Sequence, residues 1–188
     1  MASSYDSLEA ELHDAFWDAE DSPEFDWLNA LLKQQPGISL EVGCGSGRLL
    51  LPLLKNGHKI EGLEPSPTML GLCREGAKQQ NLSPVLHHGT MASLNTTTRY
   101  QSILIPAFTL QLSDHPGADL QVLHKHLAPD GILYLTTFIP YAEIDGELPE
   151  NEWYPDHELK LDGGLQAKLK TRHRIDHEAQ ILHREHHY

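Results

Sequence analysis

The stretch Ile38–Arg48, ISLEVGCGSGR, decides how the rest of the chain is interpreted. A short apolar segment is followed by three glycines at alternate positions, Gly43, Gly45 and Gly47, and then by the start of a leucine-rich helix. Glycine permits positive φ angles and lets a ligand approach the backbone without obstruction by a Cβ atom. Amide groups at a helix start favour oxygen-rich ligands. The stretch therefore predicts a ligand-binding turn between a strand and a helix.

The composition limits the class of protein. The chain has 188 residues, of which 39% are hydrophobic and 22% charged, which is typical of one globular domain. The formal net charge of −13 disfavours nucleic acid and anionic membranes as partners. We interpret the one short basic cluster, Arg172 to Arg174, as a solvated strand face. No apolar run is long enough to cross a membrane.

Cysteine and histidine usage favours a reduced protein without a metal centre. Cys44 and Cys73 do not form a disulfide framework or a zinc pattern, and Met1–Tyr5 carries no secretory signal, so we expect a cytoplasmic location. Three of the thirteen histidines, His183, His186 and His187, fall on one expected strand. His186 would face away from the other two, so no metal site is expected.

Apolar periodicity and turn signals predict alternating strands and helices. Expected strands span 38–42, 58–63, 85–88, 100–105 and 132–138, and expected helices 5–17, 22–34, 48–55, 66–80 and 118–127. Pro52 predicts a kink or a late start in the third of these helices. An acidic, proline-rich loop at 141–162 and an antiparallel hairpin at 165–188 should follow.

This alternation predicts an α/β fold, a mostly parallel sheet with helices on both faces and a C-terminal antiparallel hairpin. In such sheets ligands bind at the carboxyl ends of the strands, near the point where strand order reverses. The glycine turn, Glu64, Thr90 and Pro106 all lie at those ends. We expect one domain, with N-terminal helices or a lid at 1–35, a cofactor-binding core at 36–138 and the insertion and hairpin at 139–188.

The spacing of the glycines selects among adenosyl ligands. A dinucleotide turn needs G-x-G-x-x-G, and Arg48 stands where its third glycine would be. The observed pattern, E-x-G-x-G-x-G from Glu41, resembles the first motif of the class I, Rossmann-like S-adenosylmethionine-dependent methyltransferases. Gly89-Thr90-Met91 and the turn at 127–131 resemble two later motifs of that family. The resemblance covers residues 36–138 well.

The resemblance implies S-adenosyl-L-methionine as cofactor and S-adenosyl-L-homocysteine as product. Glu64 would accept hydrogen bonds from the ribose hydroxyls, as acidic residues do in dinucleotide folds. Glu41 would approach the methionine amino group, and Pro65 the adenine. Thr90 departs from the family's acidic residue at the adenine amino group. The implied cofactor-binding residues are Glu41, Gly43, Cys44, Gly45, Gly47, Glu64, Pro65, Thr90, Met91 and Pro106.

No residue in the sequence identifies the molecule that accepts the methyl group. Methyl transfer from a sulfonium depends mainly on alignment of donor and acceptor, although an oxygen or nitrogen acceptor can need a general base. Candidates by location are His87, His88, His115, Glu143 and His173. The acidic charge and the antiparallel insertion favour a small-molecule acceptor. Tyr5 and Trp17 are candidates for an N-terminal lid.

The family's sheet ends with two further strands that this sequence does not supply before Tyr188. We expect a truncated chain or a short form that completes its sheet as a homodimer, because an uncovered fifth strand leaves unpaired backbone groups. Two alternatives to a methyltransferase stay open: a catalytically inactive adenosylmethionine-binding or scaffold protein, and a dinucleotide-dependent oxidoreductase.

Overall fold

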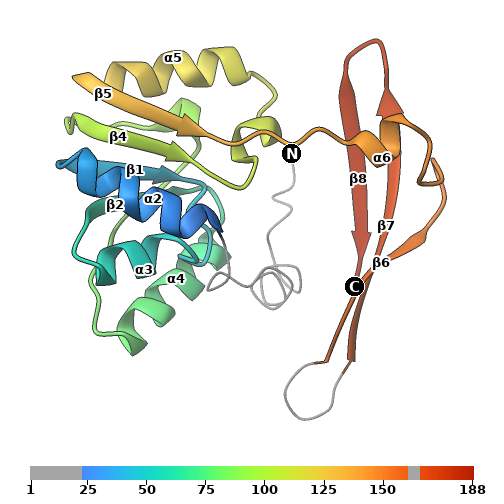
Figure 1. The fold of residues 1–188 in the computed structure, drawn as a ribbon, viewed down its shortest axis with the longest axis horizontal. Coiled ribbons are helices and arrows are strands. Elements are labelled where there is room, and N and C mark those ends of the chain that lie inside the picture. The colour runs from blue at the N-terminus through green and yellow to red at the C-terminus, as the bar shows by residue number, and fades with distance from the viewer. Residues whose placement is uncertain (1–22, 161–165) are drawn as a thin grey trace. The chain divides into compact units, whose positions relative to one another are not determined.

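The computed structural model describes residues 23–160 and 166–188 (Figure 1). These divide into two compact units, which lie within Met1–Thr137 and Phe138–Tyr188. The expected helix at 5–17, the lid residues Tyr5 and Trp17, the helix cap Ser22 and Leu165 lie outside the described residues.

A five-stranded parallel sheet forms the centre of the first unit, in the order β3-β2-β1-β4-β5. Its strands are β1 (Ile38–Val42), β2 (Lys59–Glu64), β3 (Val85–His88), β4 (Tyr100–Ile105) and β5 (Leu127–Leu135). The chain builds outward from β1 to β3 and then returns to place β4 on the other side of β1. The strand order therefore reverses between β1 and β4, and the predicted α/β fold is confirmed.

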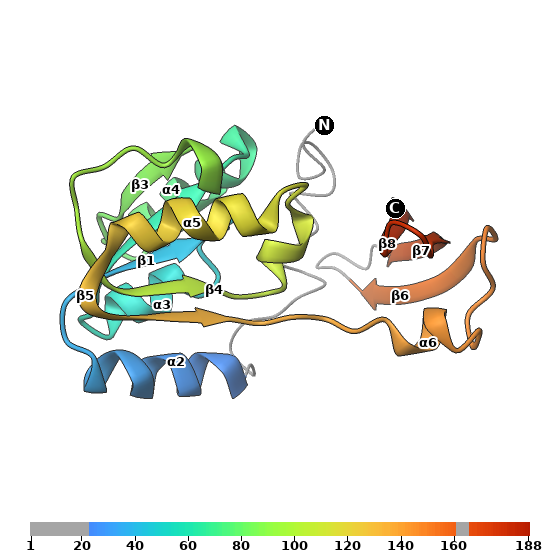
Figure 2. The same ribbon diagram turned by 90° about the horizontal axis from the view of Figure 1, so that it is seen from above.

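Two cores cover the two faces of this sheet. On one face, α2 (Pro23–Gln34), α3 (Leu50–Lys55) and α4 (Pro67–Gln79) pack with side chains such as Ile60 and Leu104. On the other, α5 (Pro116–His126) packs through Leu123 on Leu40, Val42 and Ile103. Figure 2 shows α5 and α2 on opposite sides of the sheet. Alternation along β1 consequently points Glu41 toward the face covered by α2, α3 and α4.

Local sequence signals explain most helix boundaries. The Ser66 hydroxyl accepts a hydrogen bond from the Met69 backbone nitrogen at 3.2 Å, and Pro67 occupies the first turn of α4, as predicted. The helix after the glycine turn begins only at Leu50, which places Pro52 in its first turn and confirms the expected late start. Gly57, with φ of +86°, follows the C-cap Asn56.

The fifth strand differs from its prediction. It begins at Leu127, because Leu127 pairs with Tyr100 and the expected turn is absorbed as a register shift before the Ser102–Ile132 pair. It ends at Leu135 rather than Phe138, because its partner β4 ends before Pro106, which has no backbone N–H to extend a ladder. The continuously apolar composition of this segment is typical of a strand buried on both faces, but the strand is only partly buried, because it forms the edge of the described sheet.

The second unit contains a three-stranded antiparallel sheet in the order β6-β7-β8. The hairpin of β7 (Gln166–Asp176) and β8 (Ile181–His187) confirms its prediction. The loop expected at 141–162 is wrong in part, since it holds α6 (Tyr141–Ile144) and β6 (Tyr154–Lys160). The sequence did not predict β6, because the strand contains Pro155, is mostly exposed and has a bulge between Pro155 and His157, so it lacks the alternation of a half-buried strand.

The basic cluster on β7 is not uniformly solvated. Arg174 is exposed and Arg172 pairs with Glu185 at 2.6 Å, but His173 is only 2% exposed. Strand alternation places His173 on the covered side of the sheet with Ala167, Leu169 and Thr171. Among the described residues, no helix is long and apolar enough to span a membrane.

Candidate cofactor site

The glycine turn after β1 requires glycine at each alternate position. Gly43, Gly45 and Gly47 have φ values of +72°, +53° and +92°. A Cβ atom on Gly43 would lie 2.5 Å from Cγ2 of Thr109, and one on Gly47 would lie 2.8 Å from Sγ of Cys73. Backbone conformation and close packing therefore both exclude a side chain at these two positions.

Internal hydrogen bonds fix the shape of this turn. The backbone nitrogens of Gly43 and Cys44 donate to the Leu63 carbonyl of β2 at 2.8 and 3.2 Å, and that of Gly47 donates to the Cys44 carbonyl at 2.9 Å. These amides are already used within the protein. At these positions the turn therefore offers a ligand its shape and its carbonyl groups rather than its amides.

Glu64, at the end of β2, ties the turn to the next helix. Its carboxylate accepts hydrogen bonds from the Gly45 nitrogen at 3.0 Å and from the Ser66 nitrogen at 2.9 Å. The side chain is 5% exposed. Glu64 thus lies beside the glycine turn, where its predicted role requires it, but it also orders the turn itself.

Glu41 places a buried carboxyl beneath the turn. The residue is 3% exposed, and its Oε2 atom has no hydrogen-bond partner among residues 23–160 and 166–188. Burial raises the pKa of this carboxyl to about 8, against the opposing effect of Arg48 and with the help of Glu24 and Glu64. The uncharged form consequently predominates at neutral pH, and one buried oxygen is left for a hydrogen-bond donor.

Cys44 contributes to the turn through its backbone only. Its side chain is buried, and a Cβ atom on Gly62 of β2 would lie 2.6 Å from its sulfur. Burial raises the pKa of the thiol, and the negative charge of the nearby Glu41 raises it further. Both cysteines are free and buried, which supports the structural interpretation of Cys44 over a redox thiol.

The ends of β2 and β3 place the residues expected near the adenine. Pro65 is exposed, and its carbonyl is hydrogen-bonded to His88 Nε2 at 3.0 Å. Thr90 is also exposed, and its backbone nitrogen donates to the Ser93 hydroxyl at 2.8 Å. The side chain of Met91 is buried in the core beside α5, so only its backbone remains for a ligand.

The loop after β4 lies against the glycine turn at the reversal point of the sheet. Pro106 is buried, and its carbonyl accepts hydrogen bonds from the Thr109 nitrogen at 3.1 Å and hydroxyl at 2.7 Å. Ala107 and Phe108 both have positive φ, +50° and +61°. Such conformations cost energy in residues other than glycine and concentrate at functional sites. This backbone presents the Phe108 ring, 44% exposed, at the carboxyl end of β4.

Thr109 has no sequence signal of its own, and its packing against Gly43 was not predicted.

The residues predicted as candidate general bases do not lie together in the structure. His87 is hydrogen-bonded to Glu61 at 2.7 Å, His88 to the Pro65 carbonyl, and His115 is the N-cap residue of α5. Glu143 and His173 belong to the second unit.

The residues present fit the aminoacyl end of S-adenosylmethionine. An ammonium group is a hydrogen-bond donor, and Glu41, directly before the turn, holds a buried oxygen without a partner among the described residues.

No group of three metal-ligating side chains occurs within the parts of the chain that the structure describes.

Comparison with known proteins identifies the family. Residues 40–131 match the family described as "Methyltransferase domain". A dTDP-3-amino-3,6-dideoxy-α-D-glucopyranose N,N-dimethyltransferase of Streptomyces fradiae is 31% identical over 97 residues, which cover 50% of this chain and 36% of that protein. Residues 40–131 thus match a methyltransferase domain, which confirms the predicted resemblance to the class I S-adenosylmethionine-dependent methyltransferases over this part of the chain. The match spans only about a third of the curated relative's length.

Solved structures share the fold over nearly the whole chain. The CcbJ methyltransferase from Streptomyces caelestis has a TM-score of 0.75 and 24% identity, covering 98% of this chain and 74% of its own. The amino pentose methyltransferase CalS10 from Micromonospora echinaspora, solved with bound S-adenosylmethionine, has a TM-score of 0.68 and 18% identity, with coverage of 94% and 79%. At these identities the likeness establishes the fold alone.

Proposed function

We propose that this chain binds S-adenosyl-L-methionine and transfers its methyl group to a small molecule, releasing S-adenosyl-L-homocysteine. The observation that supports this most directly is the convergence of the glycine turn, Glu41 and Glu64 where the strand order reverses. Two of the relatives agree with this proposal: the Streptomyces fradiae protein is described as an amino-sugar N,N-dimethyltransferase, and CalS10 as an amino pentose methyltransferase with bound S-adenosylmethionine. The single domain with a core at 36–138 is part of the same proposal.

Each cofactor contact is assigned to a feature of the site. The buried oxygen of Glu41 receives the ammonium group, and the carbonyls and shape of the turn through Gly43, Cys44, Gly45 and Gly47 fit the aminoacyl chain. Glu64 accepts from the ribose hydroxyls through further lone pairs of its carboxylate, whose two oxygens also accept from the Gly45 and Ser66 nitrogens. The remaining contacts are proposed for the exposed Pro65, Thr90, the Met91 backbone and Pro106.

The protein's contribution to the reaction is alignment and exclusion of water. The sulfonium of the bound cofactor supplies an activated methyl group, which an acceptor lone pair attacks in line. A fixed backbone at Ala107 and Phe108 positions the aromatic ring beside this path, and positioning alone accounts for several orders of magnitude in such displacements. The acceptor proposed is a small molecule with an amine, by analogy with the named relatives.

Calorimetric titration with S-adenosylmethionine, S-adenosylhomocysteine and NAD tests the proposal. We expect S-adenosylmethionine and S-adenosylhomocysteine to bind and NAD not to bind. Binding of NAD but of neither other ligand would reject the methyltransferase proposal and favour an oxidoreductase. Tight cofactor binding with no methylation across a panel of amines would favour the alternative, a catalytically inactive adenosylmethionine-binding protein.

We also infer self-association and a reducing location. β5 is the edge of the described sheet, and its Leu133 is exposed, which supports pairing with a second copy. Light scattering that gives the mass of one chain across the micromolar range would reject a homodimer.

The two free, buried cysteines favour a reducing compartment such as the cytoplasm. Fractionation of cells that express the protein would test this location.

A further inference from the structure

A cavity of about 570 Å³ lies between the C-terminal half of α4 and the segment that leads into β3. We call it the α4–β3 groove. Its apolar lining comes from Ala77, Leu82, Pro84 and Leu86, and its charged lining from Arg74 and Lys78. Cavities of this volume commonly hold small molecules. None of these residues belongs to the proposed cofactor site, so the groove is separate from it.

Backbone hydrogen bonds at the end of α4 fix the shape of the groove. Asn81 has a φ of +55°, and its nitrogen donates to the Lys78 carbonyl at 3.2 Å. The next nitrogen, of Leu82, donates back to the Ala77 carbonyl at 2.8 Å. This pair of bonds is the Schellman arrangement of a helix C-terminus, which brings the residue after the turn against the last turn of the helix. The groove is therefore formed without a ligand.

The apolar lining is only half covered by the protein. Leu82 and Leu86 pack on the core beneath α4, but both remain partly exposed, as does Pro84. An apolar body laid over these side chains would remove more of their surface from water, which is favourable.

The two cations of the groove have no partner among residues 23–160 and 166–188. Arg74 and Lys78 are exposed, and neither forms a hydrogen bond or an ion pair with a described residue. They lie four residues apart on α4, so their side chains are neighbours and their like charges repel. The helix C-terminus favours a cation at Lys78, in the last turn, but not at Arg74, in the middle of the helix. A bound anion would relieve the repulsion.

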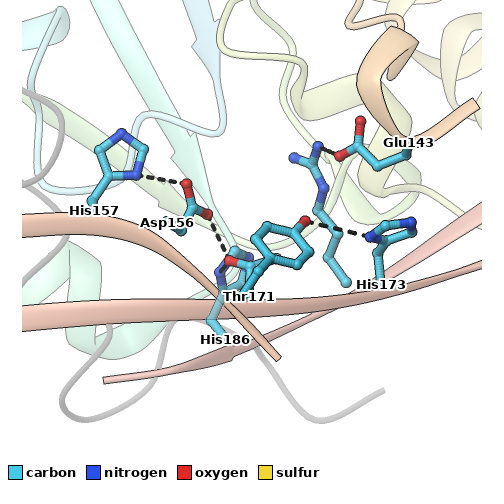
Figure 3. Close-up of polar contacts among 8 residues, drawn as sticks. Glu143, Asp156, His157, Thr171, His173 and His186 are labelled. Atoms are coloured by element: carbon cyan, nitrogen blue, oxygen red, sulfur yellow. Dashed lines mark hydrogen bonds and ion pairs between the residues drawn. The ribbon is translucent and has the colours of Figure 1, made fainter. Parts of the chain in front are cut away.

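Cations of the second unit, for comparison, are neutralised by carboxylates. Arg184 pairs with Glu143 (Figure 3), and Arg172 pairs with Glu185. On α4 the neighbouring acid, Glu75, lines an adjacent groove and not the α4–β3 groove. The positive charge of the α4–β3 groove is thus available to a ligand, in a chain of net charge −13.

We propose that the α4–β3 groove binds a small amphipathic anion, a molecule with a carboxylate or phosphate head group on an apolar body. The planar guanidinium of Arg74 can donate two parallel hydrogen bonds to such a head group, and Lys78 adds a second positive charge. Asn81 and Ser83, which also line the groove, supply neutral donors. An anionic membrane does not fit, because the net charge of the chain repels it. The proposal goes beyond the methyltransferase function and does not depend on it.

The test is a titration of the ¹⁵N-labelled full chain with octanoate, followed by NMR. The backbone amide signals of Lys78, Leu82 and Leu86 should shift saturably. Two matched compounds, 1-octanol with the same body and no charge and butyrate with the same head group and a shorter body, should each bind at least about tenfold more weakly. Octyl phosphate, titrated in parallel, identifies the preferred head group, and tighter binding of either anion supports the proposal.

Variants separate the groove from nonspecific binding. Arg74→Gln and Lys78→Gln should each weaken octanoate binding about fivefold, because each removes one charge from the head-group site. Both side chains are exposed, so the fold should be unaffected. The matched control is Lys125→Gln, which removes an exposed cation from α5 on the other face of the sheet and should leave the affinity unchanged. The affinity for S-adenosylhomocysteine should be the same in all three variants.

Several results would overturn the proposal. They are the absence of saturable shifts at Lys78, Leu82 and Leu86, equal affinity for octanoate and 1-octanol, and unchanged octanoate affinity in Arg74→Gln and Lys78→Gln. Competition between octanoate and S-adenosylhomocysteine would place the anion in the cofactor site and also overturn it. Octanoate binding in a protein that does not bind S-adenosylhomocysteine would support the groove and reject only the cofactor proposal.

Discussion

The side chain of Thr109 occupies the space into which a Cβ atom on Gly43 would project. The distance from that Cβ position to Thr109 Cγ2 is 2.5 Å, and to Oγ1 2.8 Å. Thr109 cannot easily move away, because its hydroxyl donates to the Pro106 carbonyl at 2.7 Å. The loops after β1 and β4 are therefore packed into one another where the strand order reverses.

Gly43→Ala should reduce both stability and cofactor affinity. A residue other than glycine at φ of +72° costs about 1–2 kcal/mol, and the clash with Thr109 adds to it. Urea unfolding measures the first effect and titration with S-adenosylhomocysteine the second. Thr109→Ala in the same chain should recover part of the loss, since it removes the two nearest atoms.

Gly71→Ala is the matched control for this substitution. Gly71 lies inside α4, and nothing is within 4 Å of its Cβ position. Alanine there should stabilise the protein by about 0.5–1 kcal/mol and leave cofactor affinity unchanged. Equal changes in the free energy of unfolding and in cofactor affinity for Gly43→Ala and Gly71→Ala would contradict the close packing of the loops after β1 and β4.

The sequence predicted the parallel sheet well because its signals are local. Strand β1, the cap at Ser66 and the glycine turn each depend on residues within a few positions of one another. The packing of Thr109 on Gly43 and the buried oxygen of Glu41 depend on contacts between distant segments, which periodicity does not report. Likewise, β6 becomes a strand only because β7 supplies its hydrogen-bond partners, despite Pro155 and a bulge.

Histidine placement shows the same limit. Alternation correctly separated His186 from His183 along β8. The burial of His173 was missed, because its flanking arginines indicate a solvated strand and only the three-dimensional sheet shows that its other face is covered.

Glu64→Gln should disturb the site twice. The amide keeps the shape of the side chain but turns one acceptor oxygen into a donor, which opposes the N–H of either Gly45 or Ser66. We expect a loss of about 1–3 kcal/mol in stability and at least about tenfold in affinity for S-adenosylhomocysteine. The control Glu75→Gln changes an exposed carboxylate on α4. Unchanged affinity in Glu64→Gln would remove Glu64 from the cofactor site.

The thiols of Cys44 and Cys73 should resist modification in the native protein. Both are buried, and burial raises the pKa of Cys44, so the reactive thiolate is scarce at neutral pH. A thiol reagent such as DTNB should react with neither cysteine until urea unfolds the chain, and then with both. Rapid reaction of one thiol under native conditions would contradict this and reopen a redox role for Cys44.

Glu41 should make stability fall as pH rises. Its folded pKa of about 8 lies above the ordinary value of 4.5, so the folded state binds the extra proton between these values. Stability from this group is complete below pH 4.5 and is lost as pH rises toward 8, by at most ~1.4 kcal/mol per pH unit. Urea unfolding of the protein and of Glu41→Gln from pH 5 to pH 8.5 isolates the effect, because other groups cancel in the difference. A difference that is constant with pH would contradict it.

Cofactor binding should oppose this trend. If the ammonium group of S-adenosylhomocysteine binds at Glu41, the ion pair favours the charged carboxylate and lowers its pKa, so that binding releases a proton below pH 8. Affinity should then rise with pH between 6 and 8, by up to about tenfold per unit. Calorimetry in two buffers with different ionisation enthalpies counts the protons directly. Glu41→Gln should bind more weakly and without proton release, because its amide cannot change charge. Proton release that persists in Glu41→Gln would place the linked group elsewhere, whereas its absence from the unmodified protein would show that the ammonium does not bind at Glu41.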